Sequence, residues 1–319
     1  MCASNRTPRN DVRRKGTSCD TAVLSSVNDK RPHQDVPFRP APLSKEEYVE
    51  QAYFFRTFRE RLEDNVPTQV ILQHLRDEVL ATTHLPYAVD FMLAEIKHSG
   101  LLHPALKRLP HYFTPFQTFI IAQAEEERTL RFTMQLALLV LEREAEYKSK
   151  DPTPAGLFVY QFETLCRNRL GYDSGLLAMA EDPLYDENWR AWIRKLPGWL
   201  GTVDLADLIY VRSEYAVQQR RRVRPNYEPR HAILFGEREG RIAAANRGKD
   251  PLYLFSALQR QLNYPKVPRA ERPDPQAKLL QNLERRVQNL EARLKLLEEE
   301  TKGELDITKY TVGRGGGTG

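Results

Sequence analysis

The densest group of reactive side chains in this sequence is a run of four arginines: Arg220, Arg221, Arg222 and Arg224. Guanidinium groups in such a run bind the phosphates of nucleic acids or of anionic lipid headgroups. No recognisable nucleic-acid-binding motif accompanies the run, and a solvated or protein-pairing face explains it more simply. We interpret it as a candidate anion-binding site, with nucleic acid as a partner that the sequence does not favour.

Glutamates and one histidine at helical spacing raise a metal hypothesis. Glu95 and His98 form a Glu-x-x-His pair. Other glutamates in helical patterns are Glu50, Glu125, Glu126, Glu127 and Glu163. Di-iron bundles need two Glu-x-x-His pairs, and the second is missing because Cys166 follows Glu163 at that spacing. Charged helix faces explain the pattern more simply, so we expect no metal site and no cofactor.

Two further patterns fall short of catalysis. Gly236 and Gly240 have the spacing of a glycine-rich loop but lack the Lys-Ser/Thr of a phosphate-binding loop. Asp173 and Ser174 lie far from His231 in the chain, so they do not suggest a nucleophile arrangement. With no catalytic motif, the sequence favours a protein that is not an enzyme.

Composition limits the class of protein. The 319 residues are 41% hydrophobic, enough for a sizeable core, and 48 basic against 43 acidic residues give a net charge of only +5. Cys2, Cys19 and Cys166 have no metal-ligand spacing. Two of them lie in the expected disordered tail, so we expect no disulfide framework, which favours a reducing cytoplasm. The polar N-terminus lacks the apolar core of a signal peptide, and we expect no membrane span.

A long helical pattern over residues 113–147 is the element around which the first half is organised. Thr114 is a good N-cap and Pro115 suits the first helical position. If the helix is continuous, it runs about 50 Å. Residues 132–141 are apolar nearly all round, which requires packed neighbours on several sides.

Shorter helices precede this element. Residues 1–42 are polar and proline-rich, so we expect a disordered tail. Ser44 and Glu47 have the spacing of a capping box, and Asn65 and Gly100 suit left-handed helix ends. Val49, Tyr53 and Phe54 are among the apolar residues expected on one face of the first helix. Short connections favour a compact helical bundle over residues 44–150.

The order of these features over residues 53–147 resembles the cytoplasmic domain of the type II secretion system F protein, the inner-membrane platform protein also found in type IV pilus assembly. The matching residues are Phe55, Phe58, Asn65-Val66-Pro67, Ile96, Gly100, Leu102, Ala105, Leu106, Pro110, Phe113 and Pro115. Where the family carries Gly-Glu-x-x-Gly-x-Leu, this chain has Ala124-Glu125-Glu126-Glu127-Arg128-Thr129-Leu130, so both glycines are replaced.

The resemblance implies a six-helix bundle that binds other proteins of an assembly machine and performs no chemistry. The family carries two such domains with membrane helices, whereas this chain has one copy and no span. The loss of both glycines also implies that the break between the last two helices is lost or reduced.

A smaller, mostly helical α+β domain is expected over residues 156–264, after a linker that starts at Asp151. Residues 204–215 are ambiguous between helix and strand. Residues 231–235 and 241–245 flank a glycine-containing turn, which predicts a β-hairpin over residues 231–245. Trp189 and Trp192 are expected to be core or interface anchors.

The clearest periodic signal follows a proline-rich linker at residues 265–277. Heptad positions a and d over residues 278–302 are occupied by Leu280, Leu283, Val287, Leu290, Leu294 and Leu297. In a parallel pair, Arg286 would meet Glu291 and Arg293 would meet Glu298, so the charges favour a parallel homodimer. Residues 303–319 are expected to form a flexible tail.

The leading hypothesis from the sequence is a non-enzymatic cytoplasmic scaffold or adaptor. It would self-associate through the coiled coil and dock a component of a secretion or pilus assembly machine on its helical bundle. The alternative is a nucleic-acid-associated protein that uses the basic run at residues 220–224.

Overall fold

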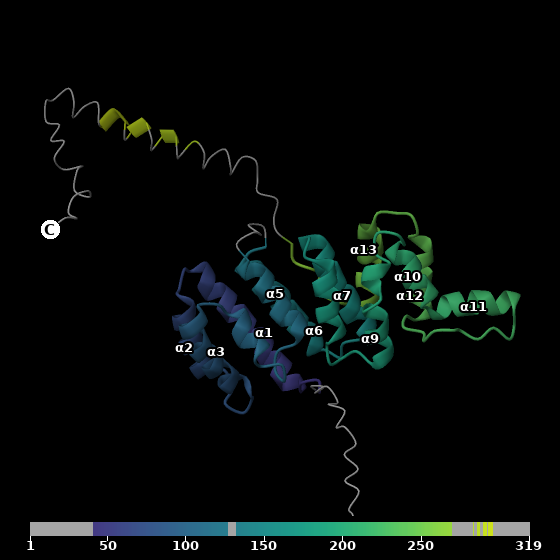
Figure 1. Cartoon of the computed structure of the whole chain (residues 1–319), viewed down its shortest axis with the longest axis horizontal. Helices are drawn as coiled ribbons and strands as arrows, with labels where there is room; N and C mark the ends of the chain where they lie inside the picture. The colour runs from purple at the N-terminus through teal and green to yellow at the C-terminus, as the bar shows by residue number, and fades with distance from the viewer. Residues whose placement is uncertain are drawn as a thin grey trace, which may run out of the picture. The chain divides into compact units, whose positions relative to one another are not determined.

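The computed structural model describes residues 41–126 and 132–269, together with eight positions between 283 and 295. The first six helices are α1 Lys45–Glu63, α2 Thr68–Glu78, α3 Leu85–Ser99, α4 His103–Lys107, α5 Pro115–Glu125 and α6 Met134–Lys148. The next are α7 Pro154–Asn168, α8 Tyr172–Ala180, α9 Glu187–Ile193, η1 Leu196–Gly198, α10 Leu205–Val211, α11 Glu214–Val223, α12 Glu237–Ala245 and α13 Pro251–Leu262. The mainly helical prediction is confirmed, and the described residues contain no β-strand (Figure 1).

Local capping chemistry sets several helix ends where the sequence predicts them. Thr114 and Gln117 cap α5 reciprocally, with each side chain accepting a hydrogen bond from the other residue's backbone N–H. Gly100 ends α3 with φ of 70°, and Asn65 follows α1 with φ of 59°. The predicted box at Ser44 is only half formed, because the Glu47 carboxylate binds His84 and Tyr112 instead.

The expected long helix over residues 113–147 is interrupted. α5 ends at Glu125, residues 127–131 lie outside the described part of the chain, and α6 starts at Met134. Thr133 caps the new start by accepting a hydrogen bond from Leu136 N–H. The expected continuous helix is therefore two helices, α5 and α6.

Helix α6 is apolar on several sides because it is surrounded. α1 lies along it, and α5 and α7 also pack against it. Ala137, Leu138, Val140 and Leu141 are fully buried. On α1 the buried face is shifted from the expected one, since Val49 and Tyr53 are exposed whereas Tyr48, Phe54 and Phe55 are buried.

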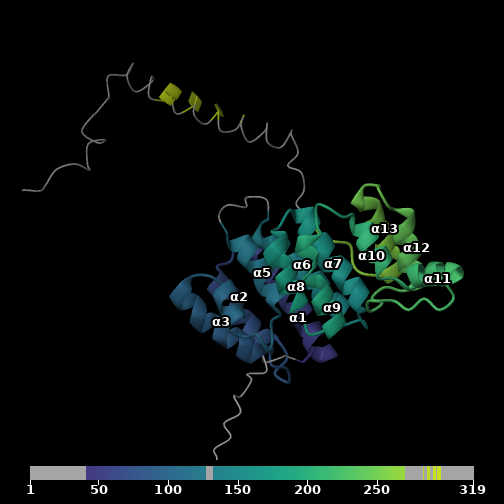
Figure 2. The same cartoon turned by 45° about the vertical axis from the view of Figure 1, so that its right-hand side comes forward.

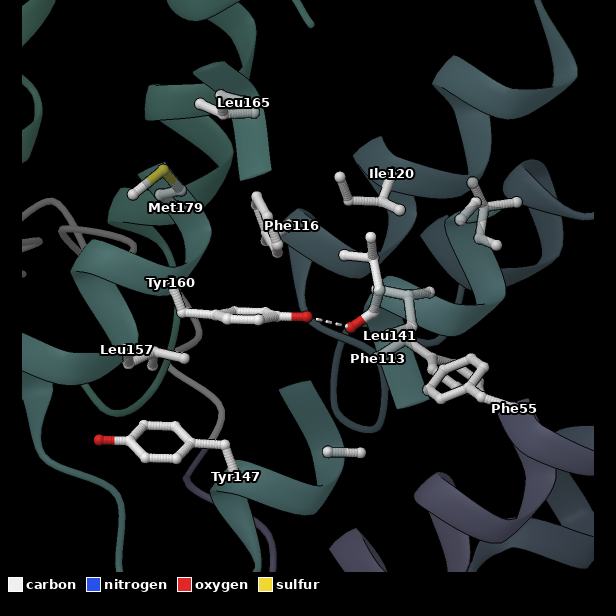
Figure 3. Packing of buried hydrophobic residues seen from close by; sticks show 14 of the residues in the cluster. Phe55, Phe113, Phe116, Ile120, Leu141, Tyr147, Leu157, Tyr160, Leu165 and Met179 are labelled. Carbon is white, nitrogen blue, oxygen red and sulfur yellow. Dashed lines mark hydrogen bonds between the residues drawn. The ribbon is translucent and has the colours of Figure 1, made fainter. Parts of the chain in front are cut away.

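The two halves of the described chain share one hydrophobic core. A single cluster of buried apolar residues extends from Ala52 to Val267, across the connection at Asp151. Tyr160 of α7 donates a hydrogen bond of 2.7 Å to the carbonyl of Val140 in α6 (Figure 3). Figure 2 shows α5 to α9 between α2 and α3 on one side and α10 to α13 on the other. The segment at 151–155 therefore joins parts of one packed body.

The predicted β-hairpin over residues 231–245 is wrong. Residues 237–245 form α12, and the segment before it makes only an isolated bridge between Phe235 and Ser213. Gly240 lies inside the helix, where an added Cβ would stand 2.2 Å from Ser213 Oγ. The glycine thus permits close approach of two helices and does not form a turn. The ambiguous stretch at 204–215 is also helical, in α10 and the start of α11.

The proline-rich linker begins later than expected. Tyr264 and Val267 are buried, and Tyr264 donates a hydrogen bond to the Glu163 carboxylate. Asn168 Nδ2 donates to the carbonyl of Pro268 at 3.1 Å. Residues 264–268 therefore belong to the packed body. Residues 1–40, 270–277 and 303–319, assigned to tails and linker from the sequence, lie outside the described residues.

Candidate functional site

A basic arm projects from the body beyond α10 and α12 (Figures 1 and 2). We use the term arm for α11 and the returning segment, residues 214–234. Only the start of α11 packs against the body, since Ala216 and Val217 are buried whereas the residues from Gln218 to Arg224 are not. Residues 214–234 contain five arginines and two glutamates. The arm is therefore a positively charged projection held at its base.

The base of the arm is an aromatic cluster. Phe235 is buried against Phe158, Trp189 and Trp192, with ring centroids 6.2, 5.1 and 5.6 Å away. Its carbonyl accepts a hydrogen bond from Glu214 N–H at 2.9 Å. Both ends of the arm are thus fixed to the body at neighbouring points. Trp189 and Trp192, which the sequence predicts to be core or interface anchors, lie in the core.

The four predicted anion-binding arginines fall into two groups, two that contact Tyr227 and two that do not. Arg220 donates to the Tyr227 hydroxyl at 2.5 Å and lies over the same ring, with 5.3 Å to its centroid. Arg221 donates to the Tyr227 carbonyl at 3.2 Å. Arg222 and Arg224 are exposed. Among the described residues, no carboxylate pairs with any of these four guanidinium groups.

An open groove of about 660 Å³ lies between α11 and the returning segment. Its apolar lining comes from Val211, Val217 and Val223, and Val223 is 81% exposed. Its cationic lining comes from Arg220, Arg224 and Arg230. Arg220 and Arg224 of the predicted run therefore line the groove together with Arg230, which follows the run in the sequence, and Arg221 and Arg222 lie outside the groove. The groove combines an apolar wall with unpaired positive charge, a combination that a run of arginines in the sequence does not reveal.

The predicted coiled-coil positions form a second candidate site. The described residues between 283 and 295 are helical and exposed. Leu283, Val287, Leu290 and Leu294 are 48, 50, 57 and 58% exposed in the single chain. Leu280 and Leu297 lie outside the described residues. The four described heptad residues therefore present an uncovered apolar seam.

A buried charged cluster, which the sequence analysis missed, joins α6, α7 and the connection between α8 and α9. Lys148 Nζ lies 2.7 Å from Asp182 Oδ2 and 3.1 Å from Glu144 Oε1, and all three side chains are fully buried. Gln161 Nε2 donates to Glu144 at 2.7 Å, and Tyr185 donates to Gln161 at 2.8 Å. A signal was present, because Glu144 and Lys148 interrupt the apolar face of α6. It resembled an ordinary exposed i,i+4 pair.

Burial controls protonation in this cluster. It raises the pKa of Glu144, against the opposing effect of Lys148. Burial alone would lower the pKa of Lys148, but the carboxylates of Asp182 and Glu144 outweigh it and raise that pKa. Glu144 Oε2 has no hydrogen-bond partner among the described residues. The raised pKa means that burial favours the neutral form of Glu144 beside the Lys148–Asp182 ion pair, because a buried charge is costly.

A pH series should expose the raised pKa of Glu144. A folded-state pKa above the unfolded value of 4.5 means that the folded chain binds the proton more tightly. The stability that this proton contributes is present below pH 4.5 and is lost as pH rises through the folded-state pKa. As pH rises above 4.5, Glu144→Gln should therefore gain stability relative to the wild type, measured by urea denaturation. Glu60→Gln at an exposed position is the control, and a parallel pH response of the two variants would contradict the assignment.

Several residues of the metal hypothesis instead serve as hydrogen-bond and ion-pair partners, and Glu127 lies outside the described residues. Glu50 accepts from Leu80 N–H, and Glu125 accepts from the N–H groups of Leu102 and His103. Glu95 pairs with Arg108. No group of three potential metal ligands occurs among the described residues. Burial raises the pKa of Cys166 to about 11, so this thiol stays protonated near neutral pH.

Comparisons with known proteins identify no relative: no family model, no curated protein and no solved structure matches this chain. Within the described residues, no helix combines the length and the apolar character needed to cross a membrane.

Proposed function

We propose that this chain is a non-enzymatic scaffold that pairs with a second copy of itself through residues 278–302 and displays its helical body to a partner protein. The observation that carries the proposal is the seam of Leu283, Val287, Leu290 and Leu294, about half exposed at consecutive a and d positions. Burying such side chains against a second copy stabilises a dimer by roughly 25 cal/mol per Å² of apolar surface removed from water.

The charges beside the seam favour parallel pairing of the two helices. Arg286 and Arg293 occupy g positions, and Glu291 and Glu298 occupy the e positions that face them in a parallel pair. Arg286, Glu291 and Arg293 are exposed in the single chain, so they are accessible to a partner. An antiparallel pair would place arginine opposite arginine, which is unfavourable.

Sedimentation equilibrium of the full-length chain at micromolar concentration tests the dimer. We expect a dimer for the wild type and a monomer for Val287→Asp/Leu290→Asp, because two buried carboxylates per helix oppose the apolar seam. Lys295→Asp, at an outward b position, is the matched control and should remain dimeric. A wild-type chain that is monomeric at this concentration would remove the self-association part of the proposal.

The partner of the scaffold is proposed to be a component of a secretion or pilus assembly machine, which would place the protein in the cytoplasm. This part rests on the resemblance of residues 53–147 to the type II secretion F domain. The six helices between Lys45 and Lys148 are compatible with it. Affinity capture with full-length bait should recover such components. Capture that repeatedly recovers none would remove this part of the proposal and leave the dimer unaffected.

A further inference from the structure

The groove on the arm has two properties that together define its ligand. Its valine wall favours an apolar side chain, and its arginines favour carboxylates or phosphates. A nucleic-acid backbone would use only the cationic half and would leave Val223, at 81% exposure, in contact with water. The groove therefore fits a peptide that carries both acidic and apolar residues.

The C-terminal part of this same chain contains such a peptide. Residues 298–307 include Glu298, Glu299, Glu300, Glu304 and Asp306, against a single lysine. Leu305 and Ile307 alternate with Glu304 and Asp306. In an extended segment, this alternation presents the apolar side chains on one face and the carboxylates on the other. The leucine seam of the coiled coil ends at Leu297, so these residues are not needed for helix pairing.

We propose that residues 298–307, here called the acidic segment, dock in the groove of the arm. Leu305 and Ile307 contact the valine wall, and Glu304 and Asp306 pair with Arg224 and Arg230. The surplus charges are complementary, since the arm, residues 214–234, holds five arginines and two glutamates.

A long connection joins the described body to the acidic segment. The described body ends at Arg269, and thirty-five positions separate it from Glu304. With residues 278–302 helical and the rest extended, the connection reaches roughly 70 Å. The proposal covers docking within one chain as well as docking between the two copies of a dimer. The proposal needs no dimer and stands apart from the proposed scaffold function.

Hydrogen–deuterium exchange of the full-length chain tests the contact. We expect Glu304→Lys/Asp306→Lys to accelerate amide exchange in residues 218–231 by about fivefold or more, because the docked segment no longer excludes water. Lys302→Glu, which adds acidic charge to the same segment, should slow exchange. Glu60→Lys on α1 is the control for a change of net charge and should leave the arm unaffected.

Charge reversal on both sides makes the test specific. Arg224→Glu/Arg230→Glu should release the segment, and combining it with Glu304→Lys/Asp306→Lys should restore protection of the arm. Equal exchange in the wild type and Glu304→Lys/Asp306→Lys would overturn the proposal. A second result would also overturn it: a single-stranded oligonucleotide binds the wild type and Glu304→Lys/Asp306→Lys with the same affinity but does not bind Arg224→Glu/Arg230→Glu. Nucleic acid would then be the occupant of the groove.

Discussion

Lys148→Met is expected to destabilise the protein by about 3–5 kcal/mol, although it replaces a charged side chain with an apolar one of similar length. The lysine ammonium is the cation for two fully buried carboxyl groups, Glu144 and Asp182. Without it, the Asp182 carboxylate keeps only the N–H of Leu184 at 3.1 Å and the Gln161 amide at 3.3 Å. A buried carboxylate without a cation carries a large desolvation cost.

Urea denaturation near neutral pH measures this cost, and Lys150→Met provides the control. Lys150 lies two residues further along the chain and is exposed, so its replacement should change the free energy of unfolding by less than about 0.5 kcal/mol. A loss below about 1 kcal/mol in Lys148→Met would show that the cluster does not depend on the lysine charge.

A second substitution separates lost charge pairing from lost packing. Asp182→Asn introduced into Lys148→Met removes the uncompensated carboxylate and should recover a large part of the stability. Replacing both members of a buried pair by neutral groups is often nearly neutral overall. If the double variant is no more stable than Lys148→Met, the loss comes from packing at the end of α6 and the electrostatic explanation is wrong.

This cluster shows where prediction from the sequence stops. Glu144 and Lys148 are four residues apart, and local spacing alone suggests an exposed helical pair. Asp182 completes the cluster from 34 residues further along the chain. No local pattern predicts which of several acidic residues folding will bring to a buried lysine. Glu47 is similar, since its capping role was predictable from Ser44 but His84 and Tyr112 bind its carboxylate.

Features set by local backbone chemistry were predictable. Gly100 and Asn65 adopt left-handed conformations because few other residues do so at low cost, and the Thr114-Pro115 pair starts a helix for similarly local reasons. Gly240 shows the limit of such arguments. A glycine between polar residues suggests a turn, but here it allows α12 to pack against Ser213. Close helix approach and turn formation both require glycine, and only the tertiary structure distinguishes them.

The sequence was enough to predict which arginines belong to the candidate site, but it did not predict the groove that they line. The sequence identifies Arg220 and Arg224 as part of a basic run. The groove forms because the chain turns back after α11, so that Arg230 of the returning segment and Val211 of α10 line the same groove. That return depends on Phe235, which sequence analysis assigned to a strand of the wrong hairpin.

Phe235→Ala is expected to destabilise the protein by about 3–5 kcal/mol, because it leaves a cavity among Phe158, Trp189 and Trp192. Phe235 is 1% exposed, so little of this cavity can be filled by relaxation of the surface. Urea denaturation followed by tryptophan fluorescence reports on the site directly, since two of its neighbours are tryptophans. Ile233→Ala, at a half-exposed position two residues away, should cost less than about 0.5 kcal/mol.

The same substitution tests whether the aromatic cluster fixes the arm. The backbone of Phe235 accepts a hydrogen bond from Glu214, the first residue of α11, so loosening its ring should loosen both ends of the arm together. Amide exchange should then accelerate at residues 212–217 and 232–236 in Phe235→Ala, while Phe235→Leu should retain most of the protection by filling much of the cavity. If exchange accelerates at only one of these two segments, the arm has two independent attachments, and the orientation of Arg220 relative to Arg230 cannot depend on this cluster.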